Sequence, residues 1–273
     1  MNVGPTQMTS KASLDRNGII EYREFLPSEQ LRPFIACYST SNSKSALETP
    51  FNHRIIPDGC VNLIFDLADP SGQYGFVTGP VRQAQFVPMV DHVQLIGIRF
   101  FPGSALHFMA AQLQVITGRS APLDAILGYT DTQLISEQLA QEPSIEKKVS
   151  ILEHYIARHL KEDIPVDSTL NNAMHFIYAS KGNIRISDLA KRLQVSHRQL
   201  DRKFNTWLGM SPKAFCRIVR FQSALKVLPG ALAEDFISIA LESGYYDQSH
   251  FIQEFHSLYG LSPSRFRATH KEL

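Results

Sequence analysis

The sequence predicts an α+β domain, built from a small β-sheet or barrel with helices, followed by an all-α domain of two helix-turn-helix units joined by a linker helix. Three observations predict this order. Short apolar runs are broken by glycine, proline and aspartate as far as Phe101, and helical spacing begins at Ser104. Residues 186–215 also resemble residues 237–266, which indicates an internal repeat.

The chain divides into three expected parts. Its 273 residues are enough for two domains that each bury a core. Residues 1–18 are polar and lack periodicity, so we expect a flexible leader. Residues 19–163 form the expected N-terminal domain and residues 164–273 the expected helical domain, with Pro165 near the boundary as a helix stop.

Apolar runs between breakers predict the strands of the N-terminal domain, and apolar spacing of three and four predicts its helices. The expected strands are 61–67, 76–79 and 92–101, and the expected helices are 104–116, 131–139 and 144–160. The last helix carries a narrow apolar seam of Ile145, Val149, Leu152 and Ile156. This seam could pair with its twin in a homodimer, but fewer than three heptads favour packing on its own domain.

Charge separates the two halves of the chain, although the net formal charge is only +1. Residues 1–164 hold 13 basic and 17 acidic residues, whereas residues 165–273 hold 14 and 9. Residues 181–230 concentrate eleven basic residues against two acidic ones. Such a face is more often simply hydrated than bound, so it raises the expectation of a polyanionic partner only modestly.

Composition excludes several other classes of protein. Cys37, Cys60 and Cys216 are odd in number and far apart, which fits neither a disulfide framework nor a metal site. No apolar run reaches the roughly 18 residues of a membrane span and no signal-peptide pattern is present, so we expect a cytoplasmic protein. Phosphate-binding loops and hydrolase motifs are missing, so we expect no cofactor, no metal and no enzyme. A reactive thiol at Cys37 or Cys60 keeps a sensor enzyme open as a weak hypothesis.

The internal repeat is the strongest signal. Leu189-Ala190 matches Ile239-Ala240 at an offset of 50, and the later matches lie at an offset of 51. The later pairs are Leu200 with Phe251, Phe204 with Phe255, Gly209 with Gly260, Ser211-Pro212 with Ser262-Pro263, and Phe215 with Phe266. Each copy reads as a short helix, a tight turn and a longer helix, which is the order of a helix-turn-helix.

Local signals mark the start of each longer helix. Ser196 and Gln199 form a Ser-x-x-Gln capping box, and Val195 and Leu200 stand at the positions of a hydrophobic staple. The corresponding residues of the second copy are Asp247 as the cap and Tyr246 with Phe251 as the staple. A joining helix is expected over residues 212–228, because proline suits its first turn and Pro229-Gly230 ends it.

Each longer helix also has a buried stripe and a polar outward face. The expected stripes are Leu200, Phe204, Trp207 and Leu208 in the first copy and Phe251, Phe255 and Leu258 in the second. The expected outward residues are Arg198, Asp201, Arg202 and Asn205 in the first copy and Ser249, Gln253 and His256 in the second.

These residues resemble the AraC/XylS family of bacterial transcription regulators over the whole helical domain. Beside the repeat, the resemblance rests on Val195-Ser196, Arg198, Arg202, Gly209-Met210, Arg220, Ala224, Gly244-Tyr245, Asp247-Gln248-Ser249-His250 and Arg267. It implies that residues 164–273 bind double-stranded DNA, with both longer helices in successive major-groove segments. It also implies contact with RNA polymerase, and activation is the more frequent mode in the family.

The resemblance places base reading on named residues. The base-reading positions are His197, Arg198, Gln199, Asp201 and Arg202 in the first unit and Gln248, Ser249, His250 and Gln253 in the second. The residues expected to bind phosphate are Lys203, Lys213, Arg217, Arg220 and Arg265, although the basic edge of Lys213, Arg217 and Arg220 could equally remain hydrated. Arginine can bridge the acceptors of guanine, and glutamine can pair with adenine. Asp201 is less expected, because a carboxylate repels phosphate; it reads a cytosine amine or orients Arg198 or Arg202.

The second unit departs from the family pattern. Gln253 stands where an arginine is common and His256 where a lysine is common. Residues 231–273 hold only three basic residues against six acidic ones. We therefore expect the first unit to supply most of the affinity for DNA.

The N-terminal domain resembles, over about residues 20–160, a little-characterised domain found ahead of such DNA-binding domains. The match rests on residues 56–61, Gly79-Pro80 and residues 97–103, where glycine and proline most simply serve tight turns. Polar residues within apolar runs could line an effector pocket, although salt-paired or surface positions are the simpler expectation. These residues are Arg54, Asp58, Cys60 and Arg99.

We therefore expect a sequence-specific transcription regulator that acts at the nucleoid. Its N-terminal regulatory or sensor domain responds in this hypothesis to a small molecule or a partner protein. A second hypothesis is a ligand-independent adaptor, in which the N-terminal domain serves only for dimerisation or for holding another protein.

Overall fold

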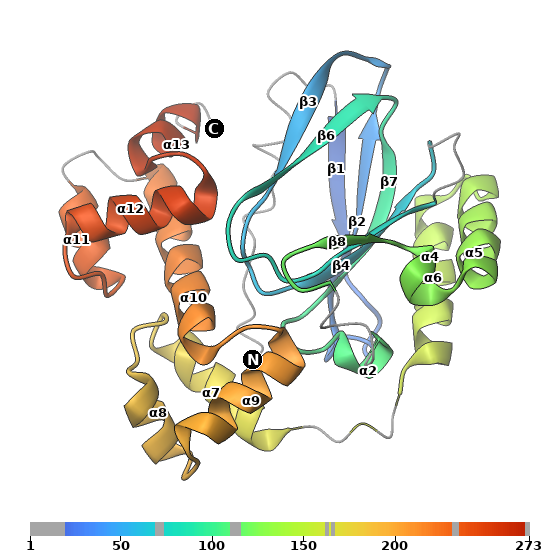
Figure 1. Cartoon of the computed structure of the whole chain (residues 1–273). Helices are drawn as coiled ribbons and strands as arrows, with labels where there is room; N and C mark the ends of the chain where they lie inside the picture. Colours follow the sequence, from blue (N-terminus) through green and yellow to red (C-terminus); the bar gives the residue numbers. More distant parts are fainter. Residues whose placement is uncertain are drawn as a thin grey trace.

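The computed structural model describes residues 20–68, 74–109, 116–161, 164, 167–230 and 235–270. The expected leader lies outside these ranges, as do residues 110–115 of the helix expected at 104–116. Figure 1 shows a β-rich N-terminal half beside a helical C-terminal half. The expected fold class, an α+β domain followed by an all-α domain, is confirmed. No helix of the described residues has the length and apolar character to cross a membrane.

A six-stranded antiparallel sheet is the framework of the N-terminal half. Its strands lie in the order β1-β2-β7-β4-β5-β8, and β3 and β6 form a separate ribbon. The strands are β1 (Ile20–Phe25), β2 (Ile35–Ser43), β3 (Leu47–Ile55), β4 (Val61–Asp66), β5 (Gly75–Thr78), β6 (Gln85–Asp91), β7 (Gln94–Phe100) and β8 (Ser120–Pro122). Strands β4, β5 and β7 match expected runs. The others escaped prediction because they hold few apolar residues or, as in β3 and β6, contain proline.

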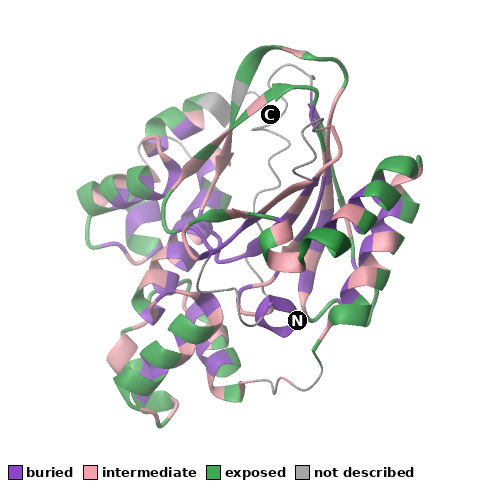
Figure 2. Cartoon of the chain, turned by 45° about the vertical axis from the view of Figure 1, so that its right-hand side comes forward, coloured by how far each residue is buried: buried purple, intermediate pink, exposed green. Residues whose placement is uncertain are grey.

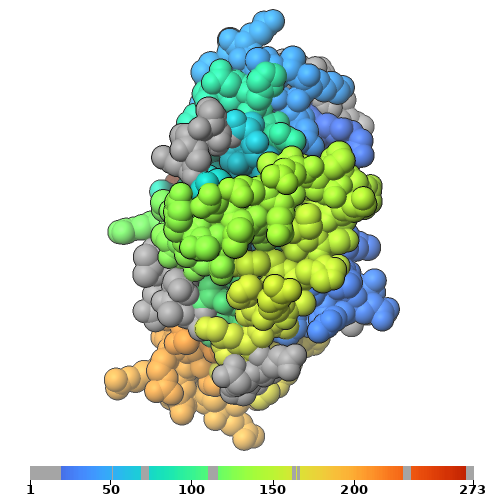
Figure 3. Space-filling view, turned by 90° about the vertical axis from the view of Figure 1, so that its right-hand side faces the viewer, coloured from blue at the N-terminus to red at the C-terminus, as the bar shows by residue number. Residues whose placement is uncertain are grey.

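The sheet buries one face under helices. In β4, Val61, Leu63 and Phe65 are buried and alternate with half-buried residues. Helices pack against the sheet in the same core, and Figures 2 and 3 bring the side with α5 and α6 toward the viewer. They are α2 (Leu106–Met109), α4 (Asp124–Leu127), α5 (Tyr129–Gln141) and α6 (Ile145–His159).

The apolar seam of α6 belongs to this core. Leu152 and Ile156 are fully buried, and Val149 is 9% exposed. Packing of the seam on its own domain is therefore confirmed, and a homodimer through other faces of residues 145–160 stays a prediction. The physical reason is that the sheet needs an apolar cover, and this seam provides it.

Two helix-turn-helix units follow, joined by one long helix. The elements are α7 (Ser168–Ala179), α8 (Ile186–Arg192), α9 (His197–Leu208), α10 (Pro212–Val227), the 3-10 turn η1 (Leu228–Gly230), α11 (Phe236–Glu242), α12 (Gln248–Tyr259) and α13 (Pro263–His270). Helix α10 is the expected joining helix. Its N-terminal half, with Phe215 and Ile218, packs in the core of the first unit. Its C-terminal half, with Phe221 and Leu225, packs in the core of the second unit.

Candidate nucleic-acid interface

Helix α9 is fixed at both ends by its own sequence. The Ser196 hydroxyl accepts the Gln199 amide at 3.2 Å, and the Gln199 side-chain oxygen accepts the Ser196 amide at 2.8 Å, so the capping box is confirmed. The helix ends at Gly209, whose φ of 66° is a left-handed conformation that favours glycine. Val195 packs on the core of the first unit, as the staple predicts. The polar face of α9 is therefore held on a rigid helix.

Helix α12 repeats this design with one difference. The Asp247 side chain accepts the amide of His250 at 2.7 Å, which confirms the expected cap, and Gly260 ends the helix with a φ of 83°. The expected staple through Tyr246 is wrong, because that side chain is 88% exposed. Tyr245 is buried instead, and its ring lies 5.2 Å from that of Phe251. The apolar contact thus comes from one residue earlier in the turn.

The outward faces of both helices reach solvent. The exposed base-reading candidates are His197, Arg198, Gln199, Asp201 and Arg202 on α9 and Ser249, His250 and Gln253 on α12, while Gln248 is half-buried. The side-chain oxygen of Gln199 serves the cap, so only its amide nitrogen is left for a base. Among the described residues, Asp201 forms no ion pair with Arg198 or Arg202, so neither arginine is oriented by it here. This face can therefore donate hydrogen bonds to base edges.

Lys203, expected to bind phosphate, is held by another part of the same domain. Its ammonium nitrogen lies 2.5 Å from a carboxylate oxygen of Asp167, which also caps α7 by accepting the amide of Leu170 at 3.0 Å. Partial burial acts to raise the pKa of Asp167, but the bonds from Lys203 and the backbone outweigh it and the pKa lies below 3.8. The pair ties α9 to α7.

Arg217 and Arg220, also expected to bind phosphate, face a carboxylate that the sequence analysis missed. Arg217 Nε donates to Glu254 Oε1 at 2.6 Å, and Arg220 Nε lies 3.8 Å from Glu254 Oε2. Arg220 also donates to the carbonyl of Gly244 at 2.9 Å. Glu254 is only 8% exposed although it lies on α12, so it locks α12 to α10. A glutamate directly before buried Phe255 is the sequence signal that could have found it.

Two basic candidates remain outside such networks. Lys213, in the first turn of α10, and Arg265, in α13, are both exposed. Within the described ranges neither forms an ion pair, so both are available to phosphate oxygens. Of the five expected phosphate contacts, the structure therefore presents these two most openly.

Three of the four residues expected to line an effector pocket come together. Asp58 and Cys60 are buried in the loop between β3 and β4, Arg99 lies half-buried beside them near the end of β7, and Asp58 accepts the amide of Cys60 at 2.8 Å. Burial raises the pKa of Asp58, and the nearby Arg99 opposes that effect. Arg99 also donates to Asn62 at 3.1 Å. The fourth residue, Arg54 in β3, instead has its guanidinium 4.4 Å from the centre of the Tyr259 ring of α12.

This buried polar cluster touches the helical domain. One carboxylate oxygen of Asp58 has no hydrogen-bond partner, and neither does the buried hydroxyl of Tyr178 on α7. Asp58 and Cys60 both raise the pKa of Tyr178, after the larger effect of burial, which places the three groups close together. Sequence analysis could not find Tyr178, because it lies more than a hundred residues from Asp58 in the chain.

The cysteines have the character of structural thiols. Cys37, Cys60 and Cys216 are free and buried, and burial raises the pKa of Cys37 and Cys216 to about 11 and that of Cys60 still higher. The thiolate is the nucleophile, so these surroundings oppose the reactive-thiol hypothesis. In the part of the chain that the structure describes, no cluster of histidine, cysteine and acidic residues could hold a metal ion.

Comparison with known proteins agrees with this geometry. Residues 189–269 match the family model of a helix-turn-helix domain, and residues 23–122 match a domain of unknown function (DUF6597). An uncharacterised HTH-type transcriptional regulator of Haemophilus influenzae is 36% identical over 124 residues, which are 44% of this chain and 41% of that protein. The matched part thus spans less than half the length of this relative.

Solved structures add two similarities. A transcriptional regulator with an AraC-type DNA-binding domain from Chromobacterium violaceum is 25% identical, over 37% of this chain and 91% of that one, with a TM-score of 0.35. ToxT from Vibrio cholerae is 10% identical, over 93% of this chain and 99% of that one, with a TM-score of 0.39. The two family models place a helix-turn-helix domain in this chain behind an N-terminal domain of unknown function.

Proposed function

We propose that this protein is a sequence-specific DNA-binding transcription regulator, and that α9 and α12 read successive major-groove segments. The observation that carries the proposal is the pair of capped, amphipathic helices mounted on one linker helix, each with its polar face exposed. In the family that the chain resembles, two such helices enter segments about one turn of DNA apart. The matched helix-turn-helix model and the name of the Haemophilus relative support the same function.

Selection from a pool of randomised duplex by the full-length protein tests this proposal. We expect a two-segment motif, and Arg202→Ala should weaken binding to it by roughly 1–3 kcal/mol, as for a lost base contact. Thr206→Ala, an exposed change one turn further along α9, is the matched control and should bind like the wild type. Enrichment of no motif at moderate salt would refute sequence-specific binding.

We propose further that the first unit dominates affinity. Helix α9 holds Arg198, Arg202 and Lys203 against one acidic residue, whereas α12 holds only Glu254 and no lysine or arginine. Gln253→Ala should therefore cost less than Arg202→Ala in the same titration. Equal losses would contradict the asymmetry.

Control through the N-terminal domain is the remaining part of the proposal. The cluster of Asp58, Cys60 and Arg99 has unsatisfied hydrogen-bonding capacity and adjoins Tyr178 of the helical domain, so a small molecule bound there could alter that contact. Thermal-shift screening of metabolites against wild type and Arg99→Gln tests this control. Stabilisation of the wild type by a metabolite that does not stabilise the variant supports it, whereas no stabilisation of the wild type by any metabolite would favour the ligand-independent adaptor.

We infer activation at promoters through contact with RNA polymerase, since this is the more frequent mode in the family that the chain resembles. Such a protein works on the nucleoid in the cytoplasm. A reporter gene placed downstream of the selected motif gives the sign directly. Lower expression in the presence of the protein would make it a repressor.

A further inference from the structure

The two glycines that end α9 and α12 are equivalent in the internal repeat, and the N-terminal domain contacts both of them. Gly209 and Gly260 lie 51 positions apart, and each adopts a left-handed conformation. Residues 82–86, which lead into β6, contact both helix ends, with Thr117 beside the first and Arg54 beside the second. We call this segment the clamp.

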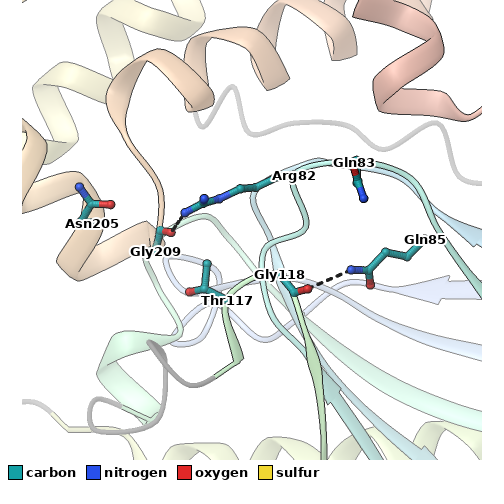
Figure 4. Close-up of a pocket in the computed structure, with 7 residues that line it drawn as sticks. All are labelled: Arg82, Gln83, Gln85, Thr117, Gly118, Asn205 and Gly209. Carbon is teal, nitrogen blue, oxygen red and sulfur yellow. Dashed lines mark hydrogen bonds between the residues drawn. The ribbon is translucent and has the colours of Figure 1, made fainter.

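The first contact joins the clamp to the end of α9. Arg82 Nη2 donates to the carbonyl oxygen of Gly209 at 2.8 Å, as Figure 4 shows. Thr117, from the neighbouring loop, packs so closely that a β-carbon on Gly209 would lie 2.0 Å from its hydroxyl oxygen. A polar cavity of about 610 Å³ lies beside this contact and includes Asn205 in its wall. The C-terminal turn of α9 is therefore in tight contact with the N-terminal domain.

The second contact joins the clamp to the end of α12. A β-carbon on Gly260 would lie 3.1 Å from the tip of the Phe86 ring and 3.5 Å from Ala84. The guanidinium of Arg54 lies 4.4 Å from the centre of the Tyr259 ring and 5.3 Å from that of Phe86, so it is placed between the two rings. The equivalent turn of the second unit is therefore held by the same segment.

The clamp is itself part of a rigid frame. Arg54 and Phe86 are register partners in the β3–β6 ribbon, and Gln85 donates to the carbonyl of Gly118 at 3.1 Å. Nearby, Gln222 of α10 donates to the buried carbonyl of Pro57 at 2.6 Å. A shift of β6 would therefore disturb the C-terminal ends of α9 and α12 together.

We infer that Arg82 and Phe86 are positioning residues for DNA reading, which set the orientation of α9 relative to α12. The inference rests on the proposed function. Each unit has its own core, and the other ties between them are α10, the Glu254 network and the packing of Gly244 on Asn183. The clamp contacts only the C-terminal ends of α9 and α12, whereas the N-terminal caps and outward polar faces of both helices stay exposed. A pair of helices held in register binds a two-segment site more tightly than a loosely oriented pair.

Titration of the full-length protein with two duplexes tests the inference. One duplex carries the motif selected by the wild type, and the other carries its first segment with the second segment scrambled. Arg82→Ala combined with Phe86→Ala should weaken binding to the two-segment duplex about tenfold and leave binding to the first-segment duplex unchanged. Arg82→Lys, which still offers a donor to Gly209, should recover most of the loss that Arg82→Ala causes alone.

Gln83→Ala is the matched control, because Gln83 is exposed in the same segment and lines the same cavity. It should bind both duplexes like the wild type. Equal weakening on both duplexes would assign the variants a general structural effect and overturn the positioning role. Tighter binding by the double variant would make the clamp inhibitory and also overturn it. Failure of the wild type to select any motif would instead refute the proposed function.

Discussion

The two helix-turn-helix units are built alike and charged differently. In both, a side-chain cap starts the longer helix, leucine and phenylalanine fill the buried stripe and a left-handed glycine ends it. In the first unit the ion pair that anchors the helix has its cation on α9, where Lys203 meets Asp167 of α7. In the second the anchor is reversed, since Glu254 on α12 meets Arg217 of α10. The repeat thus conserves backbone geometry while the polarity of the anchor changes.

This reversal has a consequence for DNA affinity. Glu254 adds negative charge to α12 and also neutralises the arginines on the adjacent edge of α10. The first unit retains exposed Arg198 and Arg202. Two units of similar fold can therefore differ in their affinity for DNA. Affinity for a polyanion depends on how many unpaired basic side chains each unit offers to phosphate.

The largest effect is expected when the anchor of the second unit is removed. Glu254→Gln leaves two partly buried arginines without a counter-charge, so the free energy of unfolding should fall by about 1–3 kcal/mol. Chemical denaturation measures this free energy of unfolding. The control is Glu242→Gln, which removes the charge of an exposed carboxylate on α11. Arg217 and Arg220 would then be free to contact phosphate, so we expect the affinity for DNA not to fall. A change no larger than the control would show that the anchor is dispensable.

A smaller effect is expected at the anchor of the first unit. Asp167→Asn keeps a good helix cap but removes the pair with Lys203, which should cost about 1 kcal/mol at neutral pH. Because the folded pKa of Asp167 lies below 3.8, the wild-type advantage is present above that value and is lost as the pH falls through the folded pKa. Unfolding curves of both proteins at several pH values check this; a pH-independent difference would contradict it.

The smallest effect concerns salt. Lys213→Ala should lower the slope of log affinity against log salt by about 1, as expected for one phosphate contact. Arg217→Ala should lower it less, because Glu254 already neutralises much of that charge. Titrations at several salt concentrations compare the two variants. If Arg217 changed the slope as much as Lys213, the anchor of the second unit would have to open on DNA.

Prediction from sequence succeeded where the determinants are local. The capping box at Ser196, the cap at Asp247 and the extent of α10 depend on residues within a few positions of one another. The N-terminal sheet was predicted only in part. Strands β3 and β6 lack a simple alternation of apolar and polar residues, because they form a two-stranded ribbon outside the main sheet. Tyr246 was misassigned because either of two adjacent tyrosines can supply the apolar contact in the turn.

By itself the sequence determined the two longer helices of the repeat, their caps, their buried stripes and the charge difference between the halves of the chain. Only the tertiary structure decided which charges are free and what holds the helices in place. The contacts of Arg217 with Glu254, of Asp58 with the surroundings of Tyr178, and of Arg82 with Gly209 join residues that are between 37 and 127 positions apart. Helical and strand periodicity report on neighbours along the chain, whereas these pairs depend on how separate elements pack.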